Sequence, residues 1–519
     1  MSTGEPGGYR FGPLERRGVL AGWRGGQVAV VAAALTVGVA VLRLGSPAGP
    51  VGAAGSVLAG LAVACWPIRG HTTEEWAPTV AAWAVRWILR RRSHRSGAPT
   101  LGRAAVVRAP CRLGPDGRWG GPRPSGRQVP SQVPTGGGAS PPGPLAGCRL
   151  LAPLVTPGAP RLGVVHDRHA RTYTAAVAVS SPPFALLGAE EQRRRVDAWS
   201  ALLAGLAREG SAVHRLQWVA RTTPGGLAGG AADGLAVAPE GAAARSYVEV
   251  AARTNDRARH HGVMIVLSLR ANGNRGPAAD EGACAVLARE LGSLQASLAA
   301  AGVAVLGPLG PPALAAALRQ PVEATPGGPA PPRLGITGHL GSGDPGRTAW
   351  PWPLATEATW AAYRTDATWH ASYWVAEWPR VDVHPGFLSP LLVEGDLRLA
   401  MALTMQPISP LRAVRDVRRA RTADVADAEL RRRGGFLTSA RRQREAELVA
   451  RREVELADGH AEYRFSGYVT VTSGSREALE ADCGRLEQAA GLARLELRRL
   501  HGRQDTAFTW TLPLARGLM

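Results

Sequence analysis

Two apolar runs lie close together near the amino terminus of the chain. Residues 28–42 read VAVVAAALTVGVAVL and residues 51–68 read VGAAGSVLAGLAVACWPI, with a Gly/Pro-rich turn over 45–50 between them. Each run is near the lower length for a bilayer-spanning helix, roughly 17–20 residues. No Ala-x-Ala cleavage site separates the runs, so a transmembrane helical hairpin explains the pattern better than a cleaved signal peptide.

Arginine is distributed asymmetrically around this hairpin. Four arginines precede the first run and six follow the second, whereas the turn region holds Arg43 alone: Arg10, Arg16, Arg17, Arg24, Arg69, Arg86, Arg90, Arg91, Arg92 and Arg95. Because positive charge is retained on the cytoplasmic side, the pattern predicts a two-pass protein of the cell membrane with both termini in the cytoplasm.

An aromatic helix is predicted directly after the hairpin. Trp76, Val80, Trp83 and Trp87 recur at spacings of four, three and four, which places them on one face of a helix. We expect this amphipathic helix to lie at the membrane interface. Its expected contact residues are Trp76, Trp83, Trp87, Arg86, Arg90, Arg91 and Arg92. Packing of the same tryptophan face against the protein's own soluble core is the alternative that stays open. Residues 1–95 thus form the predicted membrane unit.

Periodicity disappears over 96–144 and then returns. The linker ends in GGPRPSGRQVPSQVPTGGGASPPGP, from which no core can be built. Strand-like and helix-like segments alternate over 145–345 and again over 346–519, including a helix expected around 243–259. The pattern predicts an α+β fold with two cytoplasmic domains. A ferredoxin-like split arrangement fits the first of them without being required by the pattern.

The stretch 410–457 is strongly charged and favours helix, with a break at Gly434-Gly435. It is predicted to form a helical hairpin within the second domain. Its arginines are interspersed with acids and Phe436 is its only aromatic residue, so a solvated or partner-docking hairpin is favoured over a DNA-binding surface.

The amino-acid composition limits the kinds of binding site that the chain can form. All 61 basic residues among the 519 are arginine, and the formal net charge is +20, of which residues 1–145 contribute +12 through 17 arginines and five acids. The segment GSGDPGRT (341–348) has the spacing of a phosphate-binding loop, but Arg347 replaces the required lysine, and Pro351 and Pro353 oppose a following helix. We expect a surface loop there.

No catalytic, cofactor or metal site is predicted. The five cysteines form no Cys-x-x-Cys pair, which favours reduced thiols. His166, Asp167 and His169 fall in a predicted turn between strands, where no third histidine or cysteine accompanies them.

Several segments resemble known families. YRFGPLERRGVLAGWRGGQ (9–27), the apolar hairpin and EEWAP (74–78) resemble actinobacterial membrane proteins found with type IV secretion-like conjugation genes, whose hairpin is similar to PrgI-like inner-membrane subunits. The soluble part resembles the N-terminal, non-motor region of conjugation ATPases, in GVVHDRHARTYTA (163–175), FALL (184–187), HRLQWVARTTPGG (214–226), FSGYVTVT (465–472) and AFTWTLPLARGL (507–518). In that superfamily a phrase like TLPLARGL precedes the motor domain, whereas this sequence ends at Met519.

The resemblance implies a non-enzymatic scaffold for DNA transfer or protein export. We expect a membrane-anchored structural subunit of a type IV secretion-like or conjugative apparatus that docks a separately encoded P-loop ATPase. Other secretion-channel subunits and the membrane are further expected partners, DNA is contacted only indirectly, and self-association into a homo-oligomer is an option. The alternatives are a membrane-tethered nucleic-acid-binding protein and an enzyme with an unrecognised site.

Overall fold

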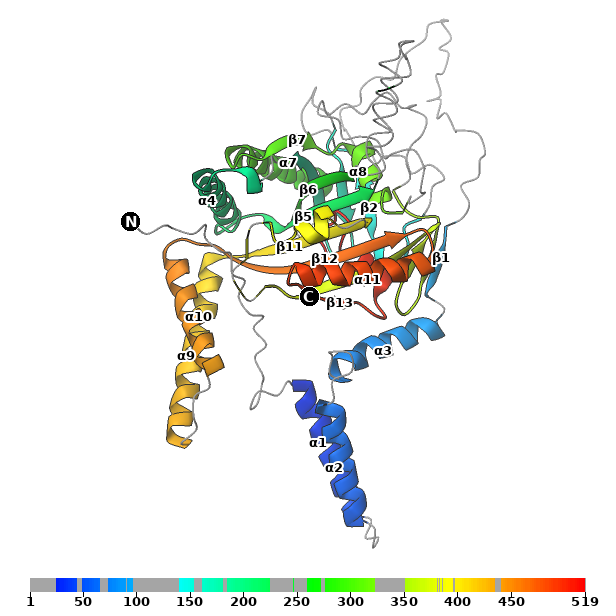
Figure 1. The fold of residues 1–519 in the computed structure, drawn as a ribbon, viewed down its shortest axis with the longest axis vertical. Helices are drawn as coiled ribbons and strands as arrows, with labels where there is room; N and C mark the ends of the chain where they lie inside the picture. The colour runs from blue at the N-terminus through cyan, green and yellow to red at the C-terminus, as the bar shows by residue number, and fades with distance from the viewer. Residues whose placement is uncertain are drawn as a thin grey trace, which may run out of the picture.

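The computed structural model describes most of the chain. The described residues are 25–43, 49–65, 73–89, 91–96, 140–153, 161–180, 184–224, 246, 259–271, 276–322, 351–379, 381, 383–384, 386–394, 397–434 and 440–518. A twisted antiparallel sheet forms the body, and two helical hairpins, α1–α2 and α9–α10, project from the same side of it (Figure 1). The predicted α+β class is confirmed.

The described part of the chain begins with three helices and continues with alternating strands and helices. Before the sheet proper come α1 (Gly25–Arg43), α2 (Gly49–Cys65), α3 (Thr73–Ile88), β1 (Ser93–Arg95) and η1 (Gly143–Leu145). The first half of the body holds β2 (Cys148–Leu151), β3 (Val164–Asp167), β4 (Thr172–Ser180), η2 (Phe184–Leu186), α4 (Ala189–Leu206), β5 (Val213–Pro224), β6 (Arg259–Arg270), α7 (Pro277–Ala300), β7 (Ala304–Pro308) and α8 (Pro311–Arg319). The second half holds β8 (Ala355–Ala358), β9 (Tyr363–Thr365), β10 (Thr368–Glu377), η3 (Pro390–Glu394), β11 (Leu399–Ile408), α9 (Pro410–Gly434), α10 (Ala440–Ala457), β12 (Glu462–Ser473), α11 (Arg476–Leu492), β13 (Glu496–Arg499) and α12 (Gln504–Phe508).

The first half contains a ferredoxin-like unit. The elements β4, α4, β5, β6, α7 and β7 follow the order strand, helix, strand, strand, helix, strand, and the pairings give the spatial order β7-β4-β6-β5. This is the split βαββαβ arrangement. We call residues 172–308 the first unit. The ferredoxin-like option left open by the sequence is therefore what the chain adopts.

The second half repeats this arrangement. The elements β10, η3, β11, β12, α11 and β13 have the spatial order β13-β10-β12-β11, with the short turn η3 in the place of α4. We call residues 368–499 the second unit. Each unit is preceded by two short strands that extend its edge, β2–β3 in one and β8–β9 in the other. The fold is thus internally duplicated.

The equivalent strands β5 and β11 join the two units. They pair antiparallel from Leu399↔Thr222 to Met405↔Leu216, so the units are related by an approximate two-fold rotation about this seam. The described strands consequently form one sheet that crosses residue 345, where the sequence analysis separated two domains. That division stays a prediction about folding units.

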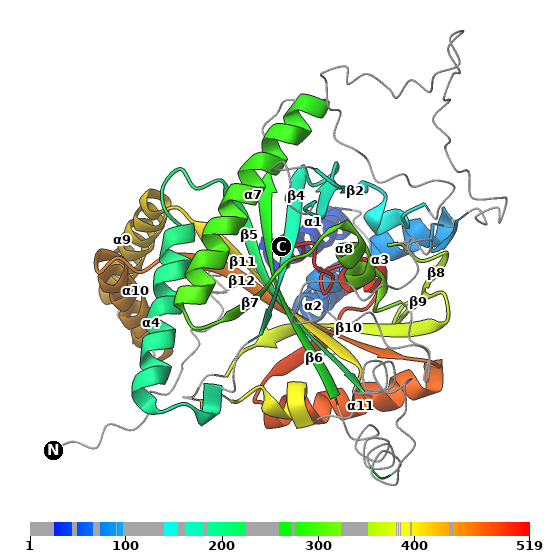
Figure 2. The same cartoon turned by 90° about the horizontal axis from the view of Figure 1, so that it is seen from above.

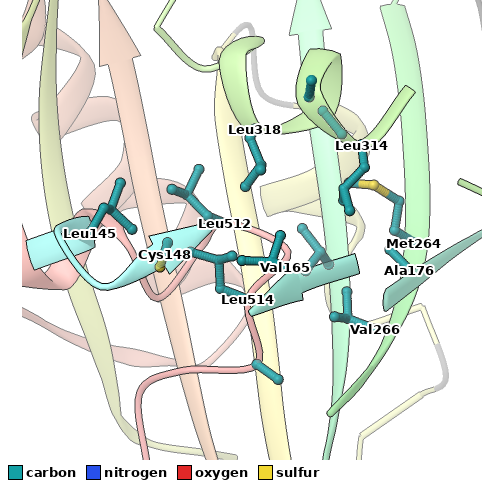
Figure 3. Close-up of a cluster of buried hydrophobic side chains, with 14 of the residues drawn as sticks. Leu145, Cys148, Val165, Ala176, Met264, Val266, Leu314, Leu318, Leu512 and Leu514 are labelled. Atoms are coloured by element: carbon teal, nitrogen blue, oxygen red, sulfur yellow. The ribbon is translucent and has the colours of Figure 1, made fainter. Parts of the chain in front are cut away.

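The sheet separates two buried layers. On one face α4 and α7 cover the first unit, α11 and η3 cover the second, and Trp218 at the seam packs against both groups (Figure 2). On the other face α8 and the segment after α12 cover the strands. Leu314 and Leu318 of α8, Leu512 and Leu514 of the last segment and Val266 belong to one buried cluster there, part of which Figure 3 shows.

The predicted apolar hairpin forms, but its helices are short. α1 has 19 residues and α2 has 17, and they lie side by side with Ser56 and Val57 close to Gly38. At 1.5 Å per residue α2 is about 26 Å long, against a hydrocarbon core of about 30 Å. Within the described part of the chain, no helix combines the length and the apolarity needed to cross a membrane. The role of this hairpin as a membrane anchor stays a prediction.

Candidate functional site

The junction between α3 and the body is the place where the predicted site residues meet the fold. Trp76 stacks on Trp360, with ring centroids 5.7 Å apart and planes inclined by 22°. Trp83 meets Trp360 edge-on, also at 5.7 Å, and His501 stacks on the same ring at 6.1 Å. Such aromatic contacts add roughly 0.5–1.5 kcal/mol per pair beyond the area they bury. Trp360 is therefore the centre of an aromatic cluster that holds α3 against the second half of the sheet.

Gly502 makes this close approach feasible. Its φ is +70°, and a Cβ at this position would lie 2.8 Å from the Trp360 ring and 3.0 Å from Thr79. Glycine adopts this backbone region without steric cost and leaves space for the indole. A glycine two residues before α12 thus leaves room for the tryptophan that contacts α3.

A polar contact reinforces the aromatic one. Nη1 of Arg86 donates to both carboxylate oxygens of Asp505, at 2.9 and 2.8 Å, and its Nη2 donates to the carbonyl of Gly502. The two side chains are 24% and 12% exposed, so the pair is largely shielded from water. A two-oxygen contact of this kind fixes geometry as well as charge. It orients α3, and with it the base of the α1–α2 hairpin, relative to the body.

The predicted membrane-interface residues separate into two groups. Trp76, Trp83 and Arg86 contact the body, and Arg92 lies over the Trp83 ring at 5.4 Å. These contacts correspond to the alternative in which the tryptophan face packs on the protein's own core.

The other residues of this set have different surroundings. Trp87 is 59% exposed and Arg91 is exposed, whereas Arg90 lies outside the described residues. The interface assignment of Trp87 and Arg91 stays a prediction. The partners Trp360 and Asp505 were missed because nothing in their local sequence marks them, and they lie more than 270 residues further along the chain.

The final segment, 509–518, binds the two units together. Gln217 on β5 donates to the carbonyl of Trp510 at 2.8 Å and accepts from the amide of Ala515 at 2.8 Å. Thr404 on β11 donates to the carbonyl of Arg516 at 2.8 Å. Because β5 and β11 are the seam strands, the segment that carries the phrase TLPLARGL lies across the joint between the units.

Two reciprocal ion pairs complete this interlock. Arg516, which follows the second unit, pairs with Asp167 in the β3–β4 turn of the first half. Arg319, at the end of α8 after the first unit, pairs with Asp366 in the β9–β10 turn of the second half, at 2.9 Å. Both turns pass through a residue with positive φ, Arg171 and Asp366. The segment that follows each unit thus forms an ion pair with the turn in the other half.

The turn over His166–His169 holds Asp167 in place for its ion pair with Arg516. Asp167 accepts from the amides of His169 and Ala170 at 2.9 and 3.0 Å. Burial raises the pKa of Asp167, but Arg516 and these amides together lower it below its ordinary value. His166 stacks on Tyr173 at 4.3 Å, and burial lowers its pKa. Among the described residues, no group of three or more His, Cys, Asp or Glu is placed to hold a metal ion.

A second buried polar group is His370 on β10. Its Nε2 is 2.6 Å from the Thr365 hydroxyl and its Nδ1 is 2.9 Å from that of Thr472. Burial lowers the pKa of His370 to about 3. The described surface has a hollow of about 520 Å³ lined by Glu377, Trp378, Pro379, Arg494, Leu495 and Glu496, and none of the buried polar groups above lines it. His370 therefore acts as a hydrogen-bonding core residue.

The cysteines and the glycine-rich segment add no site. Cys148, Cys284 and Cys483 are free and buried, and burial raises the pKa of Cys148 to about 12, which disfavours the nucleophilic thiolate. The reduced state of these thiols stays a prediction. The segment 341–348 and the helix predicted around 243–259 lie outside the described residues, apart from residue 246.

Comparison with known proteins adds no assignment. No protein-family model matches the chain, and a search of curated proteins finds no match.

Proposed function

We propose that this protein is a membrane-anchored structural subunit of a type IV secretion-like or conjugative transfer apparatus, which docks a separately encoded motor ATPase. The observation that carries the proposal is the surface of the α1–α2 hairpin. Val37, Val51 and Leu58 are 53%, 77% and 68% exposed on a projection clear of the body (Figure 1). Exposed apolar surface of this kind is characteristic of contact with a membrane or a partner.

The sequence around the hairpin favours a lipid bilayer, rather than a partner protein, as the contact of this exposed apolar surface. Arginines lie on both outer sides of the hairpin and the connecting turn is apolar or small, which matches insertion from the cytoplasmic side. Helices this short are accommodated by local thinning of the bilayer and by extension of Arg43 toward the head groups. Small residues such as Gly38 and Ala53 support close helix contact in lipid.

The body supplies the docking platform in this proposal. The resemblance to the non-motor region of conjugation ATPases covers strands of both units and the segment 507–518. That segment is held by hydrogen bonds to both seam strands, so the platform is a single interlocked body. The α3 junction joins this body to the anchor through Arg86 and Asp505. A motor bound to the body would thereby be kept at a defined position above the membrane.

The anchoring step is tested by extraction of membranes at alkaline pH. The wild-type chain is expected to stay in the membrane pellet. Leu58→Arg, on the hairpin, is expected to release it, because a charge at the bilayer centre costs roughly 2.5–3.5 kcal/mol. Leu186→Arg is the matched control, since Leu186 is 82% exposed on the body. Equal extraction of wild type and both variants would contradict the anchor.

The docking step is tested by affinity purification from the native host in mild detergent. A P-loop ATPase is expected to co-purify with the wild-type chain. Recovery of channel subunits without any such ATPase would contradict the docking role while leaving the anchor intact.

A further inference from the structure

The polar side chains of α3 are on the face that contacts the body. Between Trp76 and the last residue of the helix, the sequence contains two polar residues, Thr79 and Arg86. Thr79 is 8% exposed, and Arg86 pairs with Asp505 of the body. A surface helix of a soluble protein normally turns its polar side chains outward and its apolar side chains toward the core. The arrangement in α3 is the reverse.

The outward face of α3 is apolar along its length. Ala77, Ala81, Val85 and Ile88 recur at spacings of four, four and three, which places them on one side of the helix. All four are exposed, Val85 by 52% and Ile88 by 69%. We call these four residues the outer face of α3. Exposed apolar surface of this kind marks contact with a membrane or a partner.

The helix lies between the body and the α1–α2 hairpin. Figure 1 shows α3 running across the end of the hairpin nearest the body, and α2 and α3 are in contact. In the perpendicular view α1 and α2 are seen nearly end-on, whereas α3 is seen from the side (Figure 2). Because Trp76 and Trp83 face the body, the outer face is directed to the side on which the hairpin projects. With the hairpin in a bilayer, α3 lies along the bilayer surface.

We propose that the outer face of α3 contacts phospholipid at the membrane interface, so that the helix is held between the bilayer and the body. The proposal rests on the membrane anchor proposed above. It reverses the orientation expected from the sequence, in which Trp76 and Trp83 contact the membrane. Interfacial helices bury their apolar face at the boundary between head groups and acyl chains. Trp87, 59% exposed, and the exposed Arg91 suit the head-group level beside that face.

Lipid is favoured over a partner protein because the apolar surface is shared with the hairpin. Leu58 and Leu61 on α2 are 68% and 40% exposed, and α2 contacts α3. A bilayer that surrounds the hairpin covers the outer face of α3 as well, whereas a partner protein would need a separate apolar surface for it. Since the opposite face of α3 stacks on Trp360, the lipid contact would set the height of the body above the membrane.

The test uses the full chain with a photo-crosslinking amino acid in place of Ile88 and, in a second protein, in place of Leu186, which is 82% exposed on the body. Both proteins are reconstituted in vesicles of equal parts phosphatidylcholine and phosphatidylglycerol, and flotation measures anchoring. We expect both to float. Crosslinking to phospholipid is expected to be several-fold stronger at residue 88 than at residue 186. It should persist in about 1 M salt, which screens charges beyond about 3 Å but does not weaken an apolar contact.

Two double variants test whether the outer face itself makes the contact. With the crosslinking amino acid in place of Trp87, Val85→Asp and Ile88→Asp together are expected to lower lipid crosslinking several-fold, because a buried charge is unfavourable in an apolar phase. Leu411→Asp and Val414→Asp place two charges at the same spacing on α9, where the side chains are 62% and 37% exposed. This control is expected to leave crosslinking unchanged. Thermal unfolding verifies that both variants are folded, and crosslinking at residue 88 requires neither.

The outcomes distinguish this proposal from the anchor. Flotation without lipid crosslinking at residue 88, or equal crosslinking at residues 88 and 186, overturns the lipid contact of α3 and leaves the anchor standing. Failure to float overturns both proposals. A crosslink from residue 88 to another polypeptide in native membranes, without a lipid crosslink in vesicles, would replace lipid with a protein as the contact of this face.

Discussion

The two units have the same topology but bury the face under their covering segments in different ways. In the first unit this face carries Ala176, Ala178, Met264 and Val266, and the apolar helix α8 packs on it. In the second unit the same face of the central strands β10 and β12 carries polar groups, which bond one another and the segment around α12. They are His370, Ser372, Thr470 and Thr472, joined by Gln504 and Thr511.

This difference shows how a duplicated fold can keep its halves distinct. An apolar face accepts any well-packed cover, whereas a buried polar face requires a cover that satisfies each donor and acceptor. Gln504 accepts from the amide of Ser372 at 2.8 Å and donates to its carbonyl at 3.2 Å. Leu314 and Leu318 of α8 could not replace these bonds. Polar pairing therefore helps to hold the segment around α12 on the second unit.

On the face covered by helices both units are apolar, so substitutions there give the reference cost for comparing the stability of the two units. Leu267 in the first unit and Met401 in the second are fully buried. Leu267→Ala and Met401→Ala are each expected to lower the free energy of unfolding by about 2–5 kcal/mol, through lost burial and the cavity left behind. Denaturant unfolding followed by tryptophan fluorescence measures this. A cost below about 1 kcal/mol for one variant alone would show that the units are not equally packed on this face.

The polar face of the second unit predicts a dependence of stability on pH. Burial lowers the pKa of His370 to about 3, from an ordinary value near 6.5. The unfolded chain therefore binds a proton that the folded chain does not, and stability present above pH 6.5 is lost as the pH falls toward 3. The expected slope is about 1.4 kcal/mol per pH unit within that window.

His370→Gln separates this group from the other histidines. Its own contribution to the slope is expected to disappear, while the overall stability at pH 7 changes less than in the cavity variants. His214 in the first unit also has a lowered pKa, about 4, caused by burial and then by Arg215 and Arg270. Because His214 is half-buried, His214→Gln should alter the slope less. If the pH dependence of stability is the same in His370→Gln as in the wild type, His370 is not its source.

The reciprocal ion pairs allow the interlock to be broken from either side. Arg516→Ala leaves Asp167, whose side chain is 7% exposed, without its cation and is expected to cost about 2–4 kcal/mol. Arg319→Ala leaves Asp366, 20% exposed and still bonded to two backbone amides, and is expected to cost about 1–2 kcal/mol. Thermal unfolding of the two variants gives the order. Equal costs would mean that burial of the carboxylate does not determine the difference.

Local pattern was sufficient for most of the elements. The α+β class could be predicted because strand-like and helix-like segments alternate along the chain, and the hairpin 410–457 because its charged residues favour helix and Gly434-Gly435 interrupt it. The duplication could not be seen in this way, since η3 in the second unit replaces a full helix and the seam pairs residues about 180 apart. The tryptophan face of α3 illustrates the limit at the site. The spacing of the tryptophans predicts an amphipathic helix. Whether lipid or Trp360 covers the tryptophan face depends on a contact between segments that are distant in the sequence.

The α9–α10 arm should have the smallest effect on stability, because it is an insertion between two strands of the second unit that projects away from the sheet. Arg421 and Glu453 join its two helices, with side chains 61% and 39% exposed. Exposed pairs contribute about 0.2–1 kcal/mol, so Arg421→Gln is expected to lower the free energy of unfolding by less than 1 kcal/mol. Glu453→Gln is the matched partner variant, and the double variant should cost little more than either one. A loss above about 2 kcal/mol would mean that the arm is part of the cooperative core of the second unit, and the comparison between the units would then have to include it.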